Sequence, residues 1–351
     1  MYIRKIFGFK DMFLWTRIEA LQFIGIAIIE VLLFVFSDGL LQIPFTPIAL
    51  VGTAVAFIIG FQSNAAYGRI WEARQIWGAI VNSSRTFGMM VQDYVNNDHT
   101  RNPLSEEAIE KEVKIITYRH IAWLTALRYA MREPKPWEYI MKERTNKEWA
   151  KKIHVPEFHM SFNEAVQPYL SEKEIQYIEN KTNKQTAILY LQSHHLRALK
   201  ERGLIWEFSF LELENVIEEL FTHQGKSERI KNFPYPRQFA SILHYFTWIF
   251  IFTLPIAIVG QFHELGIKLT ERLSGAEHWF LWLAVPFSVI VMWIFHTMNR
   301  IGRVGENPFE GSANDVPISA ISRGIEIDLR QNLGEQDSVP KPFEIKNHTQ
   351  M

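Results

Sequence analysis

The sequence contains no cysteine. Disulfide frameworks, thiolate metal sites and cysteine nucleophiles are therefore excluded. The chain also lacks an excess of either charge, because 37 basic residues face 38 acidic ones and leave a formal net charge of −1. Domains that bind nucleic acid are usually strongly basic, so this balance argues against a nucleic-acid partner.

Motifs for catalysis and for cofactors are absent as well. There is no HExxH, no GxSxG and no P-loop in the sequence, and we expect neither an enzyme nor a bound cofactor. The only histidine cluster is His194 and His195. Neighbouring residues on a helix point about 100° apart, so this pair needs a third ligand to hold a metal. A membrane enzyme that uses these histidines stays open as a rival hypothesis.

Apolar and aromatic residues are abundant, at 48% and 14% of the chain, which is typical of a membrane protein rather than a soluble one. Four apolar runs approach the length that crosses a bilayer core. These runs are residues 22–36, 43–61, 239–260 and 279–295. The sequence therefore predicts four transmembrane helices surrounded by membrane lipid.

The rest of the chain predicts an all-α protein. Ser105 precedes an acidic first turn and apolar residues three and four apart, the pattern of a capped amphipathic helix. No sustained alternating strand pattern occurs. The expected organisation is a basic segment with two transmembrane helices (1–61), a helical cytosolic region (62–236), two further transmembrane helices (237–298) and a cytosolic tail (299–351).

Basic residues predict the orientation of these segments. The region 62–236 holds 24 of them, whereas the connection 37–42 holds none and the connection 261–278 only Lys268 and Arg272. Cytoplasmic loops keep an excess of Lys and Arg. We therefore expect a multi-pass protein of the inner (plasma) membrane with both termini in the cytoplasm.

The second apolar run carries a regular face. Its start predicts a helix with Thr46 as N-cap and Pro47 at the first helical position. Along it Thr53, Phe57 and Phe61 recur every four residues and stack on one side. From spacing alone this stripe is a lipid-facing or core surface, or the wall of a pore.

The continuation of the same run favours the pore. It passes without a proline into Gln62, Asn64, Arg69, Glu72 and Arg74, polar groups that hydrocarbon excludes and that water in a central channel would accept. A pore-lining helix keeps water on one side along its whole length and so leaves the bilayer unbroken. The aromatic face above would then form a hydrophobic constriction that gates by dewetting.

Three polar residues mark the other apolar runs. Glu30 lies in the middle of the first, where a carboxylate usually pairs or faces a cavity; it either holds two helices together or belongs to an ion pathway. His296 and Asn299 follow the fourth run and are predicted to anchor it at the membrane interface.

Three stretches resemble the bestrophin family. They are GFQSNAAYGRIWEARQIWG (60–78), ERIKNFPYP (228–236) and GENPFEGSANDVPISAISRGIEIDL (305–329), the last with the Asn-Pro-Phe hallmark at Asn307, Pro308 and Phe309. The resemblance covers nearly the whole chain. It implies a homopentameric channel for monovalent ions, chiefly chloride and other anions, with a cation-passing channel of the same fold or a non-conducting membrane-anchored scaffold as alternatives.

The resemblance also implies roles for individual residues. The neck of the pore falls on Thr53, Phe57 and Phe61, where Thr53 departs from the usual aliphatic residue and makes the outer ring wetter. A lower cytosolic aperture falls on Ile205 or Phe208, and the sequence leaves both open.

The segment after Asn-Pro-Phe differs from that of animal bestrophins, which bind calcium there. It reads EGSANDVP and has only Glu310 and Asp315 as acids, too few for the six to eight oxygen ligands that calcium takes. We therefore expect no calcium site, and a structural turn around Asn307.

Overall fold

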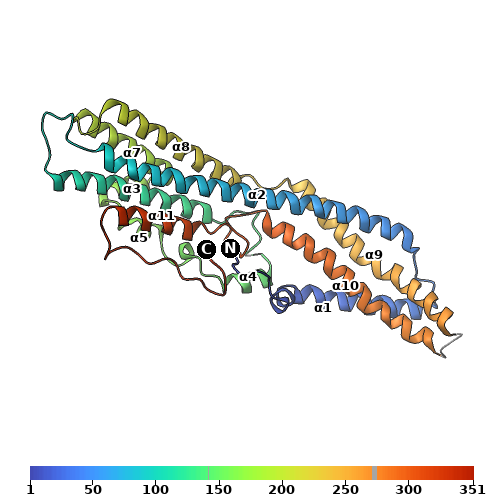
Figure 1. Cartoon of the computed structure of the whole chain (residues 1–351). Coiled ribbons are helices and arrows are strands. Elements are labelled where there is room, and N and C mark those ends of the chain that lie inside the picture. The colour runs from blue at the N-terminus through green and yellow to red at the C-terminus, as the bar shows by residue number, and fades with distance from the viewer. Residues whose placement is uncertain (141, 271–274) are drawn as a thin grey trace.

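The computed structural model describes residues 1–140, 142–270 and 275–351. Within these ranges the chain forms helices joined by short connections, and its only β-type contacts are isolated bridges at Thr349. The molecule is elongated, with a membrane half of four long helices at one end and a polar half at the other (Figure 1). The prediction of an all-α protein is confirmed.

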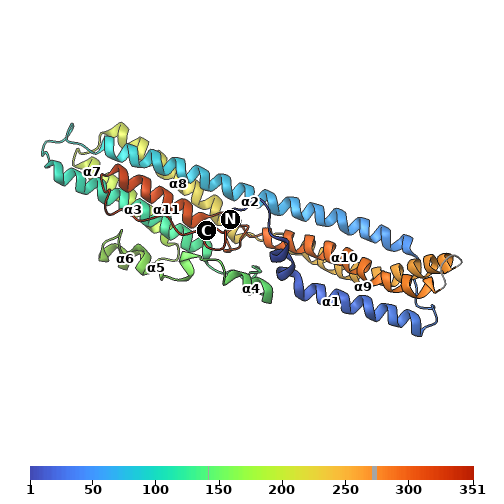
Figure 2. The same cartoon turned by 60° about the horizontal axis from the view of Figure 1, so that its bottom comes forward.

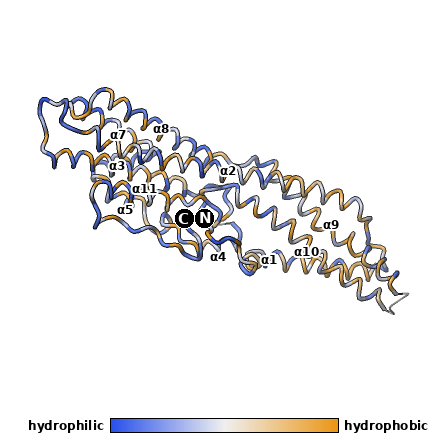
Figure 3. The backbone as a smooth tube through the Cα atoms, viewed as in Figure 1, coloured by the Kyte–Doolittle hydropathy of each residue, from blue (hydrophilic) through white to orange (hydrophobic). Residues whose placement is uncertain are grey.

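The membrane half consists of α1, the first part of α2, α9 and α10. Each of these helices is long and apolar enough to cross a membrane, and they form the apolar end of the molecule (Figure 3). Their bounds are Phe9–Phe36, Phe45–Tyr94, Arg237–Thr270 and Ala276–Gly305. The four predicted spans are thus confirmed as parts of longer helices. Arg272, counted in the predicted connection between the last two, lies outside the described residues.

The antiparallel helices α9 and α10 form the centre of the membrane half. Helix α2 packs on one side of this pair and α1 on the other (Figure 2). Close packing of α2 requires Gly52, because a Cβ there would lie 2.7 Å from a ring carbon of Phe250 on α9. One face of α2 is thereby buried, and no helix among the described residues covers the opposite face in the membrane half.

Helix α2 joins the two halves as one element of 50 residues, about 75 Å long at 1.5 Å per residue. No proline follows Pro47 in it, so nothing removes a hydrogen bond from its interior. It runs through the predicted boundary between residues 61 and 62, as α10 runs through the boundary between 298 and 299. In the polar half α2 packs against α8, Glu207–Asn232.

The core of the polar half lies between α2, α8, α3, α7 and α11. Its largest fully buried side chains include Trp77, Trp123 and Phe87. The last three helices span Glu106–Arg132, Lys184–Glu201 and Ile318–Asn332. Four short helices complete the outer side: α4 Arg144–Ala150, the 3-10 turn η1 Pro156–Phe158, α5 Phe162–Val166 and α6 Glu172–Glu179.

Predicted helix starts can be compared with the observed ones. The Ser105 cap is confirmed, because its hydroxyl oxygen accepts a hydrogen bond from the Ala108 N–H at 3.3 Å. The Thr46 cap is wrong: α2 begins at Phe45 after Pro44, which places Pro47 at the third helical position. Proline is tolerated there because the first four N–H groups of a helix have no partner within it.

The first and last residues of the chain lie beside each other on the polar half (Figure 1). The Tyr2 N–H donates to the Ala313 carbonyl at 2.6 Å, and the Gln350 N–H donates to the Met1 carbonyl at 2.9 Å. Both ends therefore lie on the same side of the membrane half.

Candidate ion pathway

The predicted neck residues lie on the uncovered face of α2. Phe57 and Phe61 are 67% and 70% exposed, while Val55 and Ile59 on the opposite face are buried in the core of the membrane half. Thr53 is also exposed, and its hydroxyl donates to the Ala49 carbonyl at 2.9 Å. Large apolar side chains thus cover a surface that the described part of this protomer leaves free.

A groove runs beside this face. Its cavity has a volume of about 390 Å³ and lies between Ala49, Gly52 and Ala56 of α2 and Phe250 and Leu254 of α9. Small residues in membrane helices permit close approach of another helix. An open apolar groove thus borders the exposed face of α2.

The polar continuation of α2 is used differently from the prediction. Gln62 and Arg69 were expected to face water in a channel, and this is wrong. Gln62 is buried and donates to the Glu306 carboxylate at 2.8 Å. The Arg69 guanidinium donates to the carbonyls of Glu306 at 2.7 Å and Ile230 at 2.8 Å. Gln62 thus pairs with a buried carboxylate, and Arg69 supplies donors to backbone carbonyls at the ends of α10 and α8.

The remaining polar residues of that stretch lie nearer the surface. Asn64 and Arg74 are exposed, and Glu72 forms an ion pair with Arg229 of α8. Asn64 and Glu72 lie within about 60° of Phe61 around the helix, whereas Arg74 lies about 220° round from it. Polar groups therefore follow Phe61 on its face at Asn64 and Glu72.

Glu306 organises the junction between the two halves, and the sequence prediction missed it. Its carboxylate is fully buried and also contacts the Arg237 guanidinium at 3.3 Å. Burial raises the pKa of Glu306, while the hydrogen bond from Gln62 and the charge of Arg237 lower it. The residue directly precedes the Asn-Pro-Phe motif, and that position is the only signal that sequence offered.

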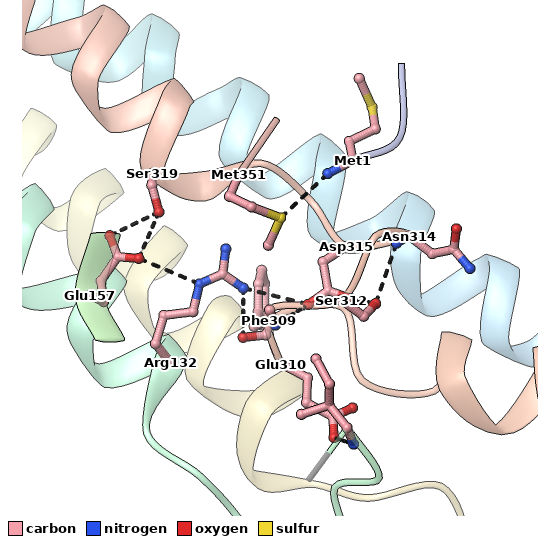
Figure 4. Close-up of polar contacts among 12 residues, drawn as sticks. Met1, Arg132, Glu157, Phe309, Glu310, Ser312, Asn314, Asp315, Ser319 and Met351 are labelled. Atoms are coloured by element: carbon pink, nitrogen blue, oxygen red, sulfur yellow. Dashed lines mark hydrogen bonds and ion pairs between the residues drawn. The ribbon is translucent and has the colours of Figure 1, made fainter. Parts of the chain in front are cut away.

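The Asn-Pro-Phe segment forms a buried turn. Phe309 is 1% exposed and its ring lies 6.5 Å from that of Trp77. The Phe309 carbonyl accepts a hydrogen bond from Arg132 of α3 at 2.8 Å (Figure 4). The Val316 N–H donates to the Pro308 carbonyl at 3.1 Å, which closes the loop.

The two acids of this segment are already engaged by the protein. Asp315 accepts from the Gly311 N–H at 2.6 Å and lies 3.4 Å from Arg132 (Figure 4). Glu310 accepts from the Ile140 N–H, and burial raises its pKa to about 8. Among the described residues no three His, Asp or Glu side chains gather as metal ligands.

The two aperture candidates have different environments. Ile205 is 2% exposed and belongs to the core of the polar half, so its side chain does not line an opening in this structure. Phe208 is 62% exposed, in the first turn of α8. It lies eleven residues before Glu219, on nearly the same face of the helix, and Glu219 accepts from Ser83 of α2 at 3.1 Å. Phe208 therefore lies on the side of α8 that faces α2.

Polar residues on the other helices have different environments. Glu30 is on α1, which packs on α9 and α10 away from α2 (Figure 2). Asn299 is buried and donates to Thr247 at 3.3 Å, so the prediction of an interfacial anchor is wrong for it. His195 lies 2.9 Å from both Glu112 and Arg119, and burial lowers its pKa.

Sequence comparison decides the family. The profile described as Bacterial/Fungal Bestrophin protein matches residues 14–331. The chain belongs to the bestrophin family. This bestrophin is similar to a Salmonella typhi protein named voltage-dependent anion channel-forming protein YneE, at 26% identity over 88% of this chain and 84% of that protein. The Escherichia coli K12 protein of the same name is 24% identical over 89% of this chain and 84% of its own length.

Solved structures agree on the fold. A crystal structure of a bacterial bestrophin homologue from Klebsiella pneumoniae superposes with a TM-score of 0.67, at 21% identity, and covers 90% of this chain and 98% of that one. A crystal structure described only as a membrane protein gives a TM-score of 0.70 at 21% identity, over 91% and 99% of the two chains. The bestrophin fold of this chain is thus established.

Proposed function

We propose that this bestrophin forms an ion channel for monovalent anions, chiefly chloride, with α2 of each subunit lining one shared pore. The observation that carries the proposal is the uncovered face of α2, which is apolar through Phe57 and Phe61 and becomes polar beyond them. Lipid would suit only the apolar part of this face. Around a common water-filled axis the apolar part packs against its copies from other subunits, and the polar part faces water.

The neck of this pore consists of rings of Thr53, Phe57 and Phe61. Apolar rings of this kind stop ions by excluding water and need no charged residue. At the far mouth Phe208 forms a second constriction, since Ile205 is part of the protein core. Because apolar rings encode no charge preference, the sign of the ion follows the names of the relatives, which are anion channel-forming proteins.

The assembly is a homopentamer with closed cyclic symmetry, in which one helix per subunit surrounds the axis. The apolar groove beside Gly52 supports such packing, because it accepts a neighbouring copy at the edge of the pore face. The protein lies in the inner membrane. Both ends of the chain meet on the polar half, and the 24 basic residues of region 62–236 support a cytoplasmic position for that half.

The test is ion flux from purified protein in liposomes under a chloride gradient. The Phe57→Ala variant widens the neck and is expected to raise conductance several-fold. Phe36→Ala is the control, because it removes an exposed phenyl ring from α1, away from α2. Reversal potentials measured under the same chloride gradient give the charge sign of the permeant ion. A reversal potential near the equilibrium potential of the cation would overturn the anion assignment.

Absence of flux from the wild type and from Phe57→Ala would instead favour a membrane-anchored scaffold. Equal conductance increases in Phe57→Ala and Phe36→Ala would mean that the pore does not lie on the α2 face.

A further inference from the structure

The turn between α7 and α8 is fastened to the far end of α2. The Asn96 N–H, just past α2, donates to the Leu204 carbonyl at 3.0 Å, and the Thr100 hydroxyl donates to the Arg202 carbonyl at 2.7 Å. Gly203 has φ +75°, and a Cβ on it would lie 2.8 Å from the His99 carbonyl oxygen. The two connections therefore pack backbone against backbone.

Three aromatic rings continue this contact to the surface. The His99 ring stacks on the Trp206 indole with centroids 5.7 Å apart and 25° between the planes. The same indole contacts the Phe208 ring at 4.7 Å and 60°. Trp206 and Phe208 are 49% and 62% exposed, so neither ring is held by a core. Their positions depend on each other and on His99.

We propose that His99 and Trp206 are positioning residues that hold Phe208 at the cytosolic mouth of the pore. The inference rests on the proposed channel function and on Phe208 as the aperture residue. An exposed phenylalanine in the first turn of a helix has several side-chain rotamers available. Contact with Trp206 selects one of them, and His99 fixes Trp206 to the end of α2.

The consequence for function is a link between the two constrictions. Phe57 and Phe61 are on α2, and the His99 support follows its last residue, Tyr94. The width of the mouth therefore depends on where α2 ends, although Phe208 itself belongs to α8.

The test measures the permeability of thiocyanate and glutamate relative to chloride in planar bilayers with the purified oligomer. Phe208→Ala should raise the permeability of glutamate, the larger of the two anions, relative to chloride. Trp206→Ala and His99→Ala should move it in the same direction by about two- to tenfold, the range that loss of one aromatic contact gives in a side-chain equilibrium. Trp206→Phe keeps a ring and should restore much of the wild-type value. Tyr177→Ala, an exposed aromatic on α6, is the control for general effects.

Double variants separate positioning from other roles. If His99 and Trp206 act through Phe208, then Trp206→Ala and His99→Ala should add nothing in the Phe208→Ala background. Additive effects would overturn the inference, and so would a dissociated oligomer in Trp206→Ala by size-exclusion chromatography, because either result gives these rings a different role.

Failure of the underlying function looks different. A wild-type protein without current overturns the channel itself and this inference with it. If the wild type conducts and Phe208→Ala has the same relative anion permeability, Phe208 is not the aperture residue. The positioning role of His99 and Trp206 then fails too, whereas the proposed neck at Phe57 is unaffected. If Phe208→Ala changes the relative anion permeability but Trp206→Ala and His99→Ala do not, only the positioning role of His99 and Trp206 is overturned.

Discussion

Glu310 is a buried acid whose neighbours include a second carboxylate. Burial is the main reason why its pKa rises to about 8, and the charge of Asp315 adds to the rise. In the unfolded chain the same group titrates near 4.5. Between these two values the folded protein binds the proton more tightly than the unfolded chain does, so stability falls as pH rises.

We expect Glu310→Gln to remove this dependence. The amide oxygen can still accept from the Ile140 N–H, and it has no charge to bury. Thermal unfolding in detergent should show a wild type less stable at pH 8 than at pH 6, by up to a few kcal/mol, and a flatter profile in the variant. Glu335→Gln is the opposite control, because Lys114, Tyr118 and Arg330 lower the pKa of Glu335 against its burial. That variant should lose stability at neutral pH. A wild-type curve that rises from pH 6 to pH 8 would contradict the assignment.

Individual side chains also mark where sequence reasoning succeeds and fails. The exposure of Phe57 and Phe61 on one face follows from helical spacing, which is a local property of α2. The partners of Gln62 and Arg69 are Glu306, Ile230 and other groups more than 160 residues away, and spacing contains no information about them. For the same reason Ile205 and Phe208 look alike in sequence although one is core and the other surface.

At the scale of elements, the turn between α7 and α8 depends on one glycine. Gly203 is left-handed and touches the backbone at His99 and Thr100, so an added methyl group meets both strain and collision.

We expect Gly203→Ala to destabilise the protein by about 1–3 kcal/mol, since backbone atoms do not move aside easily. The measurement is thermal or denaturant unfolding of the purified protein. Gly225→Ala is the matched control: it lies inside α8 with nothing within 4 Å of an added Cβ, and alanine favours the helix by up to about 1 kcal/mol. Equal stability losses in both variants would mean that the turn has no special role.

Helices themselves were predicted well because their signals are local. Apolar runs, the Ser105 cap and 3.6-residue periodicity appear in sequence and again in structure. The predicted boundary at residues 61 and 62 placed a domain change where composition changes, whereas α2 continues for a further 33 residues to Tyr94. The residue composition of a helix changes where its surroundings change from lipid to water, whereas its backbone can continue unbroken through both.

At the scale of the whole molecule, the proposed pore joins the free α2 faces of several copies of the chain. Purified protein in detergent should have the mass of a pentamer of the 41.2 kDa chain, as measured by light scattering or native mass spectrometry.

Cross-linking tests which face meets the axis. Because the chain has no cysteine, Phe57→Cys introduces the only thiol, and a short bismaleimide should join two copies into a covalent dimer. Phe36→Cys on α1 should give little cross-linking, since α1 lies on the opposite side of the α9–α10 pair from α2 (Figure 2). The reverse pattern would place α1 at the centre and contradict the proposed pore.

The unbroken length of α2 has a mechanical consequence. Gln62 and Arg69 fix this helix to Glu306 between about a third and half of the way along its 50 residues. The helix measures about 26 Å from Phe45 to Gln62 and about 38 Å from Arg69 to Tyr94. In the proposed channel a tilt of α2 at the neck would therefore reach the core of the polar half that α2 shares with α8, because no break in the helix absorbs it.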